Sequence, residues 1–265
     1  MIEAHVRRFG QGSRVAHFIH CNLSSGRAWD PLIPHVQDAV TATAVDLLGQ
    51  GRSPMPDMDR DYQMQCAEAS IAVMEEVGPQ DVVGHSFGAT VALRVAELRP
   101  DLVRSMILFE PILFCILNDV NDPQWDAIIA HEMPFHEAQV AGDTMRAAEI
   151  FISTWGMPGS WQKMPPEMRQ GFADKMWLIQ VQAGAVMETN DWRLSLDDLA
   201  AMTMPTLIMA GGDSHAAMEA TGRVIAGQMQ NATVEVLPGS GHMLPLTHSA
   251  AVAPRMHAFW DSLPA

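Results

Sequence analysis

Ser86 stands in a setting that suits a nucleophile. The stretch "DVVGHSFG" at residues 81–88 is an apolar run followed at once by a serine between two glycines. A strand that turns sharply into a helix holds such a serine in a strained backbone conformation and lifts its hydroxyl above the sheet. Side chains at Gly84 and Gly88 would collide with the neighbouring helix and strand. The pattern therefore predicts that Ser86 attacks an acyl carbon.

A serine hydroxyl needs a base to take its proton, and His242 is the histidine best placed to do so. The chain has eleven histidines. His242 lies in "PGSGHMLP", a glycine-containing loop that follows the last predicted strand. That position is the carboxyl end of the expected sheet, where Ser86 is also expected.

The base in turn needs a carboxylate to orient it, and two residues compete for this role. Asp213 follows the predicted strand in "LIMAGGDS", and Glu110 ends the predicted strand in "MILFE". An acid on the loop after one strand and a base on the loop after the next strand should be neighbours in space. We therefore favour Asp213, and interpret Glu110 as a polar group that bonds the backbone at a hinge.

Acyl transfer also requires donors that hold the oxyanion, and losing one donor costs about 2.7–4 kcal/mol. The N–H of Phe87, directly after the proposed nucleophile, is one candidate. The loop "HFIHCNLSSGRAW" at residues 17–29 should supply the second donor, most simply the N–H of Asn22.

Alternating strands and helices must position these residues. Most of the predicted strands are continuously apolar, as strands covered on both faces should be. They lie at residues 14–20, 41–49, 81–86, 105–111, 205–213 and 232–239, and helical patterns lie at 63–77, 87–98, 215–229 and 247–262. This order predicts an α/β fold with a mostly parallel, doubly wound sheet. Ligands collect at the carboxyl ends of such strands.

Residues 112–200 interrupt the alternation, because they contain helical pieces and many aromatic residues but no convincing buried strand. The segment is too long for a loop in a compact domain. We expect a core domain formed by residues 1–111 and 201–265, and a helical lid over residues 112–200. Trp155 and Trp177 from the lid, with Cys21 from the core, are predicted to line the substrate pocket.

The composition argues against several classes of partner. Asp and Glu number 31 against 16 Lys and Arg, a net charge of −15, which repels nucleic acid and anionic lipid. No apolar run approaches the roughly 18 residues of a membrane span, and the amino terminus does not read as a signal peptide. Three widely spaced cysteines predict neither a disulfide framework nor a metal site and favour the cytoplasm. No sequence feature calls for a cofactor, and a homodimer is compatible with the sequence.

Together these segments resemble the α/β-hydrolase family, in its lidded branch of small-molecule esterases and C–C bond hydrolases. The resemblance covers nearly the whole chain and rests on "HFIHCN", "AWDPL", "DLLGQGRSP", "VVGHSFG", "LIMAGGDS" and "GSGHMLPL". It implies a triad of Ser86, Asp213 and His242. The family usually has His-Gly where this chain has His20-Cys21, so the Cys21 side chain bears on the assignment of Asn22.

The first functional hypothesis is a serine hydrolase that cleaves small, mostly apolar carboxylic esters through an acyl-enzyme. The alternatives on the same triad are C–C bond hydrolysis of the meta-cleavage-product type and lactone opening. A third is a ligand-binding protein that has lost turnover. A C–C hydrolase would need a cation for the substrate carboxylate, for which the sequence offers Arg27, Arg52, Arg146 and Arg193. Haloalkane dehalogenases and epoxide hydrolases of this fold carry Asp at the position of Ser86, which argues against those activities.

Overall fold

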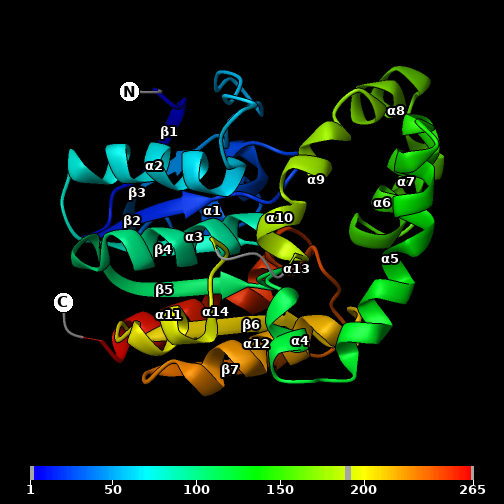
Figure 1. The fold of residues 1–265 in the computed structure, drawn as a ribbon. Coiled ribbons are helices and arrows are strands. Elements are labelled where there is room, and N and C mark those ends of the chain that lie inside the picture. Colours follow the sequence, from blue (N-terminus) through cyan, green and yellow to red (C-terminus); the bar gives the residue numbers. More distant parts are fainter. Residues whose placement is uncertain (1–2, 189–191, 264–265) are drawn as a thin grey trace.

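The computed structural model describes residues 3–188 and 192–263, which fold around one seven-stranded sheet (Figure 1). Its strand order is β1-β3-β2-β4-β5-β6-β7, with only β1 antiparallel to its neighbour. The strands are β1 (Val6–Gly10), β2 (Arg14–Ile19), β3 (Val40–Val45), β4 (Gln80–His85), β5 (Val103–Phe109), β6 (Thr206–Gly211) and β7 (Ala232–Leu237). The predicted mostly parallel α/β fold is confirmed.

Strand β1 was not predicted, and its exposure explains why. Its sequence "VRRFG" carries two arginines, and the strand is only partly buried because it lies at the edge of the sheet. Val6 pairs with Val45 in an antiparallel register. An edge strand of this kind lacks the continuous apolar run that identifies the buried strands.

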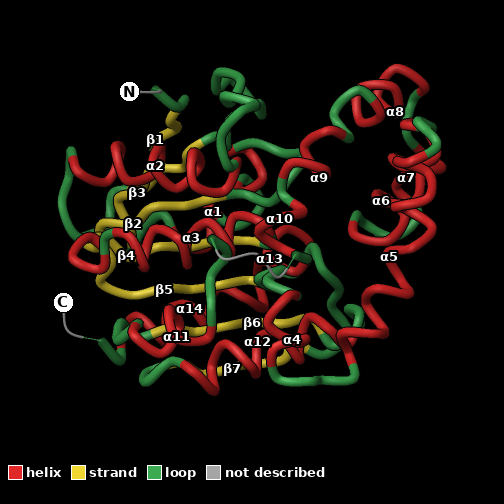
Figure 2. The backbone as a smooth tube through the Cα atoms, in the orientation of Figure 1, coloured by secondary structure: helices red, strands yellow, loops and turns green. Residues whose placement is uncertain are grey.

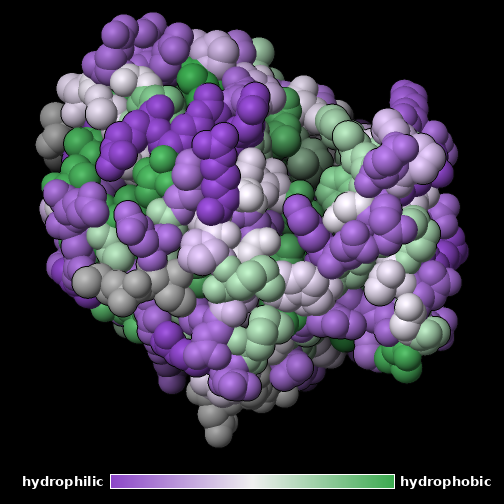
Figure 3. All heavy atoms as spheres, turned by 90° about the horizontal axis from the view of Figure 1, so that it is seen from above, coloured by the Kyte–Doolittle hydropathy of each residue, from purple (hydrophilic) through white to green (hydrophobic). Residues whose placement is uncertain are grey.

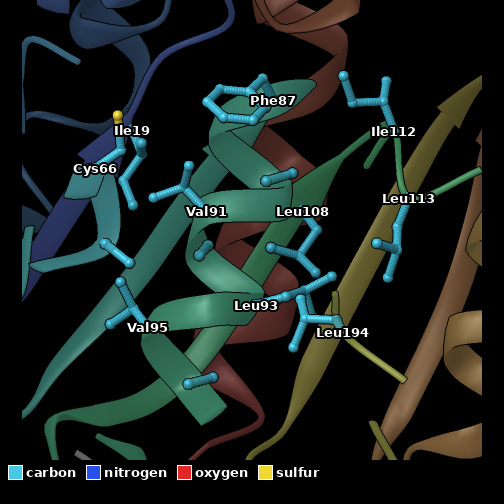
Figure 4. Close-up of a cluster of buried hydrophobic side chains, with 14 of the residues drawn as sticks. Ile19, Cys66, Phe87, Val91, Leu93, Val95, Leu108, Ile112, Leu113 and Leu194 are labelled. Atoms are coloured by element: carbon cyan, nitrogen blue, oxygen red, sulfur yellow. The ribbon is translucent and has the colours of Figure 1, made fainter. Parts of the chain in front are cut away.

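Neighbouring residues of each strand enter two different cores, because successive side chains point to opposite faces of a sheet. Val82 and Leu108 join the core under helix α3, whereas Val83 and Phe109 join the core under helix α14. Figure 4 shows the first of these cores, with Phe87, Val91 and Val95 of α3 lying over the strands.

Helices cover both faces of the sheet, as the predicted double winding requires. The outer elements of the core are η1 (Gly26–Trp29), α1 (Ile33–Val36), α2 (Tyr62–Glu75), α3 (Phe87–Leu98), η2 (Pro100–Leu102), α12 (Ala216–Gln228), α13 (Leu244–Thr247) and α14 (Ser249–Asp261). Helices α2, α3 and α12 contribute to one core and α1 and α14 to the other. Between Asp61 and Leu98, α2 and α3 begin and end close to where the sequence predicted them.

The segment expected to form the lid contains helices and loops throughout its described part, with no strand (Figure 2). Its helices are α4 (Cys115–Asp119), α5 (Gln124–Val140), α6 (Thr144–Trp155), α7 (Ser160–Lys163), α8 (Pro166–Ala173), α9 (Trp177–Val181), α10 (Ala183–Val186) and α11 (Leu196–Ala201). Helices α5 to α8 stand at the right of Figure 1, beyond the end of the sheet at which α10 and α13 lie.

The two ends of this segment pack differently from its middle. Leu117 of α4 and Leu199 of α11 are buried in the same core as α3. Phe135, Ile152 and Trp161 instead form a separate apolar cluster with other residues of α5 to α9. The lid domain with boundaries at 112 and 200 stays a prediction, and the packing groups α4 and α11 with the core.

Hydrophilic residues cover much of the face seen in Figure 3, and apolar residues lie in the recess between the main body and the α5–α8 lobe at the right. Among the described helices, none combines the length and the apolar character that crossing a membrane demands. Cys21, Cys66 and Cys115 are buried and form no disulfide with one another.

Candidate active site

Ser86 lies on a strained turn between β4 and α3. Its φ of 56° and ψ of −121° are rare for a residue with a side chain. Its N–H donates to the carbonyl of Phe109 at 2.8 Å, which fixes the turn to the neighbouring strand β5. A Cβ on Gly88 would come within 2.2 Å of the Ile19 carbonyl oxygen, and one on Gly84 within 2.5 Å of Ala89 Cα. Both glycines therefore allow the close helix–strand contact that raises the hydroxyl.

His242 lies within hydrogen-bonding distance of Ser86 and of a carboxylate. Its Nε2 is 2.9 Å from Ser86 Oγ, and its Nδ1 is 2.6 Å from Glu110 Oε2. All three side chains are buried. This places a base between a hydroxyl and an acid, the geometry that proton transfer during acyl transfer requires.

His85 contacts the backbone of His242, which the sequence did not reveal. Its Nε2–H donates to the His242 carbonyl oxygen at 2.8 Å. Burial and the neighbouring His242 hold the pKa of His85 well below its ordinary value. His85 is therefore a neutral donor that fixes the backbone of the loop carrying the base.

Glu110, and not Asp213, is the carboxylate that contacts His242, so the prediction for Asp213 is wrong. Glu110 is completely buried directly after β5, where it has a φ of 45°. Its Oε2 faces His242 Nδ1, and its Oε1 accepts the Gly211 N–H at 2.6 Å. Both carboxylate oxygens are thus occupied, which fixes the acid in one orientation.

The position of Asp213 explains the error. Strand β6 ends at Gly211, and by Asp213 the chain has reached the surface. The Asp213 N–H donates to the Ser240 carbonyl at 2.9 Å, but its exposed carboxylate bonds no side chain in the described part of the protein. Strand β5 lies next to β4 in the sheet, so Glu110 is one strand closer to Ser86 than the loop after β6. The sequence did contain a signal for Glu110, because this residue ends a predicted apolar strand.

The two residues predicted as oxyanion donors are both near Ser86, one in the chain and one in the cavity lining. Phe87 is the first residue of α3, so its N–H has no acceptor within the helix. Asn22 lines the same cavities as Ser86. Its side-chain oxygen accepts from Gln50 Nε2 at 2.6 Å, and its amide donates to Gln182 Oε1. These two bonds fix the loop that carries Asn22. The backbone N–H of Asn22 donates to no described residue, so it is available to an oxyanion.

Cys21 is held in this loop as a neutral thiol. His20 donates from Nδ1 to the Cys21 carbonyl at 2.6 Å and accepts the Leu47 N–H at 2.9 Å. Burial raises the pKa of the Cys21 thiol to about 12. Because the thiolate is the nucleophilic form, Cys21 is inert in this environment and acts through the shape of the loop.

Two cavities meet at Ser86 and His242. The larger encloses about 370 Å³ and is lined mainly by apolar residues, including Ile112, Phe135 and Trp155. The smaller encloses about 210 Å³ and is lined by Cys21, Trp155 and others. The pocket positions predicted for Cys21 and Trp155 agree with these linings. Trp177 lines neither cavity, because its indole covers the backbone of Gly49.

No lysine or arginine is found among the described residues that line these two cavities. The four arginines considered for a substrate carboxylate lie elsewhere. Arg27 and Arg52 line a separate polar cavity. Arg146 pairs with Glu149 at 2.8 Å, and Arg193 pairs with Asp119 at 2.7 Å. A carboxylate bound beside Ser86 would therefore have no lysine or arginine to pair with in the described lining.

Comparison with known proteins connects this geometry to one family. A model of the "Alpha/beta hydrolase family" matches residues 18–255. "Lipase LipV" of Mycobacterium tuberculosis is 38% identical over 112 residues, which are 42% of each chain. The "(E)-2-((N-methylformamido)methylene)succinate hydrolase" of Acinetobacter baylyi is 23% identical over 274 residues, covering 98% of this chain and 95% of that protein. The match to "Lipase LipV", which has the higher identity of the two, thus spans less than half of that protein's length.

Solved structures share the fold at low identity. MGS-M2, an "alpha/beta hydrolase enzyme from a Medee basin deep-sea metagenome library", superposes with a TM-score of 0.77 at 17% identity, covering 99% of this chain and 95% of that one. "Carboxylesterase CesB (YbfK) from Bacillus subtilis" gives 0.73 at 18% identity, covering 98% and 88%. At such identities the likeness establishes the arrangement of strands and helices.

Proposed function

The chain belongs to the α/β-hydrolase family, and from this premise we propose that it is a serine hydrolase that cleaves small, mostly apolar carboxylic esters through an acyl-enzyme. One observation carries the proposal. Ser86, His242 and Glu110 form a continuous buried hydrogen-bonded chain whose hydroxyl end opens into a mainly apolar cavity.

The first half-reaction forms the acyl-enzyme. As Ser86 Oγ attacks the ester carbonyl carbon, His242 Nε2 takes its proton, and the Glu110 carboxylate stabilises the resulting imidazolium. The N–H groups of Phe87 and Asn22 hold the negative charge on the carbonyl oxygen. His242 then returns the proton to the alkoxy oxygen as the C–O bond breaks, so that the alcohol leaves and Ser86 remains acylated.

The second half-reaction repeats these steps with water. His242 takes a proton from a water molecule, whose oxygen attacks the acyl carbon, and the same two N–H groups hold the second oxyanion. Collapse of this intermediate breaks the bond to Ser86 Oγ, which recovers its proton from His242. A carboxylic acid is released, and the enzyme returns to its initial state.

The charge of the cavities favours ester cleavage over C–C cleavage of a carboxylate-bearing substrate. A buried carboxylate without a partner is costly, and the described lining offers no lysine or arginine to pair with it. The relative from Acinetobacter baylyi is named for a succinate derivative, and a substrate of that charge is disfavoured here. We also infer a cytoplasmic location, which the three unpaired buried cysteines favour, and a homodimer stays a prediction.

A series of p-nitrophenyl esters from acetate to decanoate tests the proposal. We expect Ser86-dependent turnover that is highest for acyl chains that the two cavities can enclose. Ser86→Ala should lower kcat by at least about 10⁴-fold, since removal of the nucleophilic serine lowers kcat by about 2 × 10⁶ in subtilisin. Turnover that survives in Ser86→Ala, or no turnover together with no labelling of Ser86 by a fluorophosphonate, would contradict the assignment.

A further inference from the structure

Glu132 places a carboxyl group inside the larger cavity, although the triad does not use it. It lies on α5 and lines the cavity together with Ser86. Its Oε1 accepts the indole N–H of Trp155 at 3.1 Å, and its Oε2 accepts no hydrogen bond from any described residue. Burial raises the pKa of Glu132 to about 7. Glu132 is partly buried, and its Oε2 is not among the fully buried oxygens without a partner. This oxygen is therefore accessible from the cavity and can accept a hydrogen bond or an ion pair from a ligand.

Aromatic residues line the same cavity as Glu132. Trp155, Phe135 and Phe151 all line it, and the ring centroids of Phe135 and Phe151 are 5.7 Å apart. The polar lining residues His136, Gln139, Gln182 and Glu188 add hydrogen-bonding groups and, in Glu188, a second carboxyl group. A carboxylate beside aromatic faces is the combination that holds an alkylammonium group, by ion pairing and by cation–π attraction.

Trp155 links the Glu132 carboxyl group to the reacting centre. Its ring meets the His242 imidazole edge to face, with centroids 5.4 Å apart and an interplanar angle of 68°. Its indole N–H points to Glu132. Glu132 is therefore separated from the base by one indole ring. A substrate whose carbonyl lies at Ser86 could reach Glu132 with a spacer of a few carbon atoms.

We propose that Glu132, Trp155 and the neighbouring phenylalanines form a subsite for an alkylammonium group, so that the preferred substrates are esters carrying a positive charge a few carbons from the carbonyl. The inference rests on the proposed serine hydrolase function and adds to it the charge of the substrate. It follows from the free carboxylate oxygen, the aromatic lining and the absence of lysine and arginine from the described lining of both cavities.

Two esters of the same shape test the proposal. In p-nitrophenyl 4-(trimethylammonio)butanoate a quaternary nitrogen replaces the quaternary carbon of p-nitrophenyl 5,5-dimethylhexanoate. We expect kcat/KM of the protein at pH 8 to be about tenfold or more higher for the charged ester, which corresponds to ~1.4 kcal/mol. Glu132→Gln, which keeps an acceptor for Trp155, should lower the charged-ester value about tenfold more than the neutral-ester value. Rates in Ser86→Ala give the background.

Glu137→Gln is the matched control, because Glu137 lies on the same helix but is exposed and lines neither cavity. It removes the same charge and should leave the ratio between the two esters unchanged. An equal loss of activity toward both esters in Glu132→Gln would mean that Glu132 only positions Trp155. That result, or a ratio near one in the unmodified protein, would overturn the proposal.

Binding to Ser86→Ala separates this inference from the proposed function. The two probes are 4-(trimethylammonio)butanamide and 5,5-dimethylhexanamide, and calorimetry measures the affinity of each. We expect tighter binding of the charged amide, and loss of that preference in the double variant Ser86→Ala/Glu132→Gln. Preferential binding without ester turnover would support the subsite and contradict the serine esterase. Ester turnover without any charge preference in turnover or binding would support the serine esterase and contradict the subsite.

Discussion

At the scale of single residues, the carboxylates of Glu110, which is fully buried, and Glu132, which is partly buried, serve different purposes. Both oxygens of Glu110 are occupied, by His242 and by the Gly211 N–H. Glu132 has only the Trp155 indole as a donor among the described residues. A fully bonded carboxylate is fixed and can orient a base, whereas one with a free oxygen can receive a ligand.

The assignment of the acid is tested by a pair of variants. Glu110→Gln keeps the shape of the side chain but removes the charge that stabilises the His242 imidazolium, so we expect kcat to fall by about 10³–10⁴-fold. Asp213→Asn should leave kcat within about twofold of the unmodified protein, because the Asp213 carboxylate is exposed and bonds no side chain among the described residues. Steady-state kinetics on one p-nitrophenyl ester decide this. A larger loss in Asp213→Asn than in Glu110→Gln would restore the sequence-based assignment.

At the scale of elements, the junction of β4, β2 and α3 determines where Ser86 lies. Gly88 is packed so closely on β2 that a Cβ would lie 2.2 Å from the Ile19 carbonyl oxygen. A backbone atom cannot yield as the end of a flexible side chain can. The helix can therefore begin directly after the serine only with glycine at this position.

We accordingly expect Gly88→Ala to lower the free energy of unfolding by at least about 2 kcal/mol, as overpacking does elsewhere. Gly227→Ala is the control, since Gly227 lies in α12 with nothing within 4 Å of an added Cβ. That change should be neutral or stabilise by up to about 1 kcal/mol. Urea denaturation followed by circular dichroism measures both, and equal effects of the two substitutions would contradict the packing argument.

The sequence predicted the buried strands and the nucleophile turn because these depend on local patterns. Six apolar runs and the serine between two glycines can be read without knowing their neighbours. The acid could not be chosen in this way, because Glu110 and Asp213 both follow strands. The choice depended on which strand lies beside β4 and on where the chain leaves the sheet after Gly211. Glu132 was missed because its position depends on how α5 packs beside Trp155.

At the scale of the whole molecule, the cavity carboxyl should affect stability. Glu132 has a pKa of about 7 in the folded protein against an ordinary value of 4.5. Between these values the folded state holds more protons than the unfolded state, so the free energy of unfolding falls as the pH rises through this range. The full destabilisation that the ionised Glu132 causes is present above pH 7 and absent below about pH 4.5.

Glu132→Gln removes this titration, so its stability relative to the unmodified protein should increase with pH. We expect the variant to gain about 2 kcal/mol in the free energy of unfolding between pH 5 and pH 8, less than the full shift because Glu132 is not completely buried. Urea denaturation of both proteins at the two pH values gives this difference. The contributions of the other titrating groups cancel, because both proteins contain them. A difference independent of pH would mean that Glu132 titrates near its ordinary value.

The surface position of Asp213 has a consequence for engineering. Because Glu110, directly after β5, takes the place at His242, the turn after β6 carries no member of the hydrogen-bonded chain. Its tip can thus be lengthened or given a fluorescent label or a surface anchor, provided that Gly211 and its bond to Glu110 are kept. Immobilisation through this turn would fix the protein beside its reaction centre and next to α5, because His215 of the turn lies against His131 of that helix.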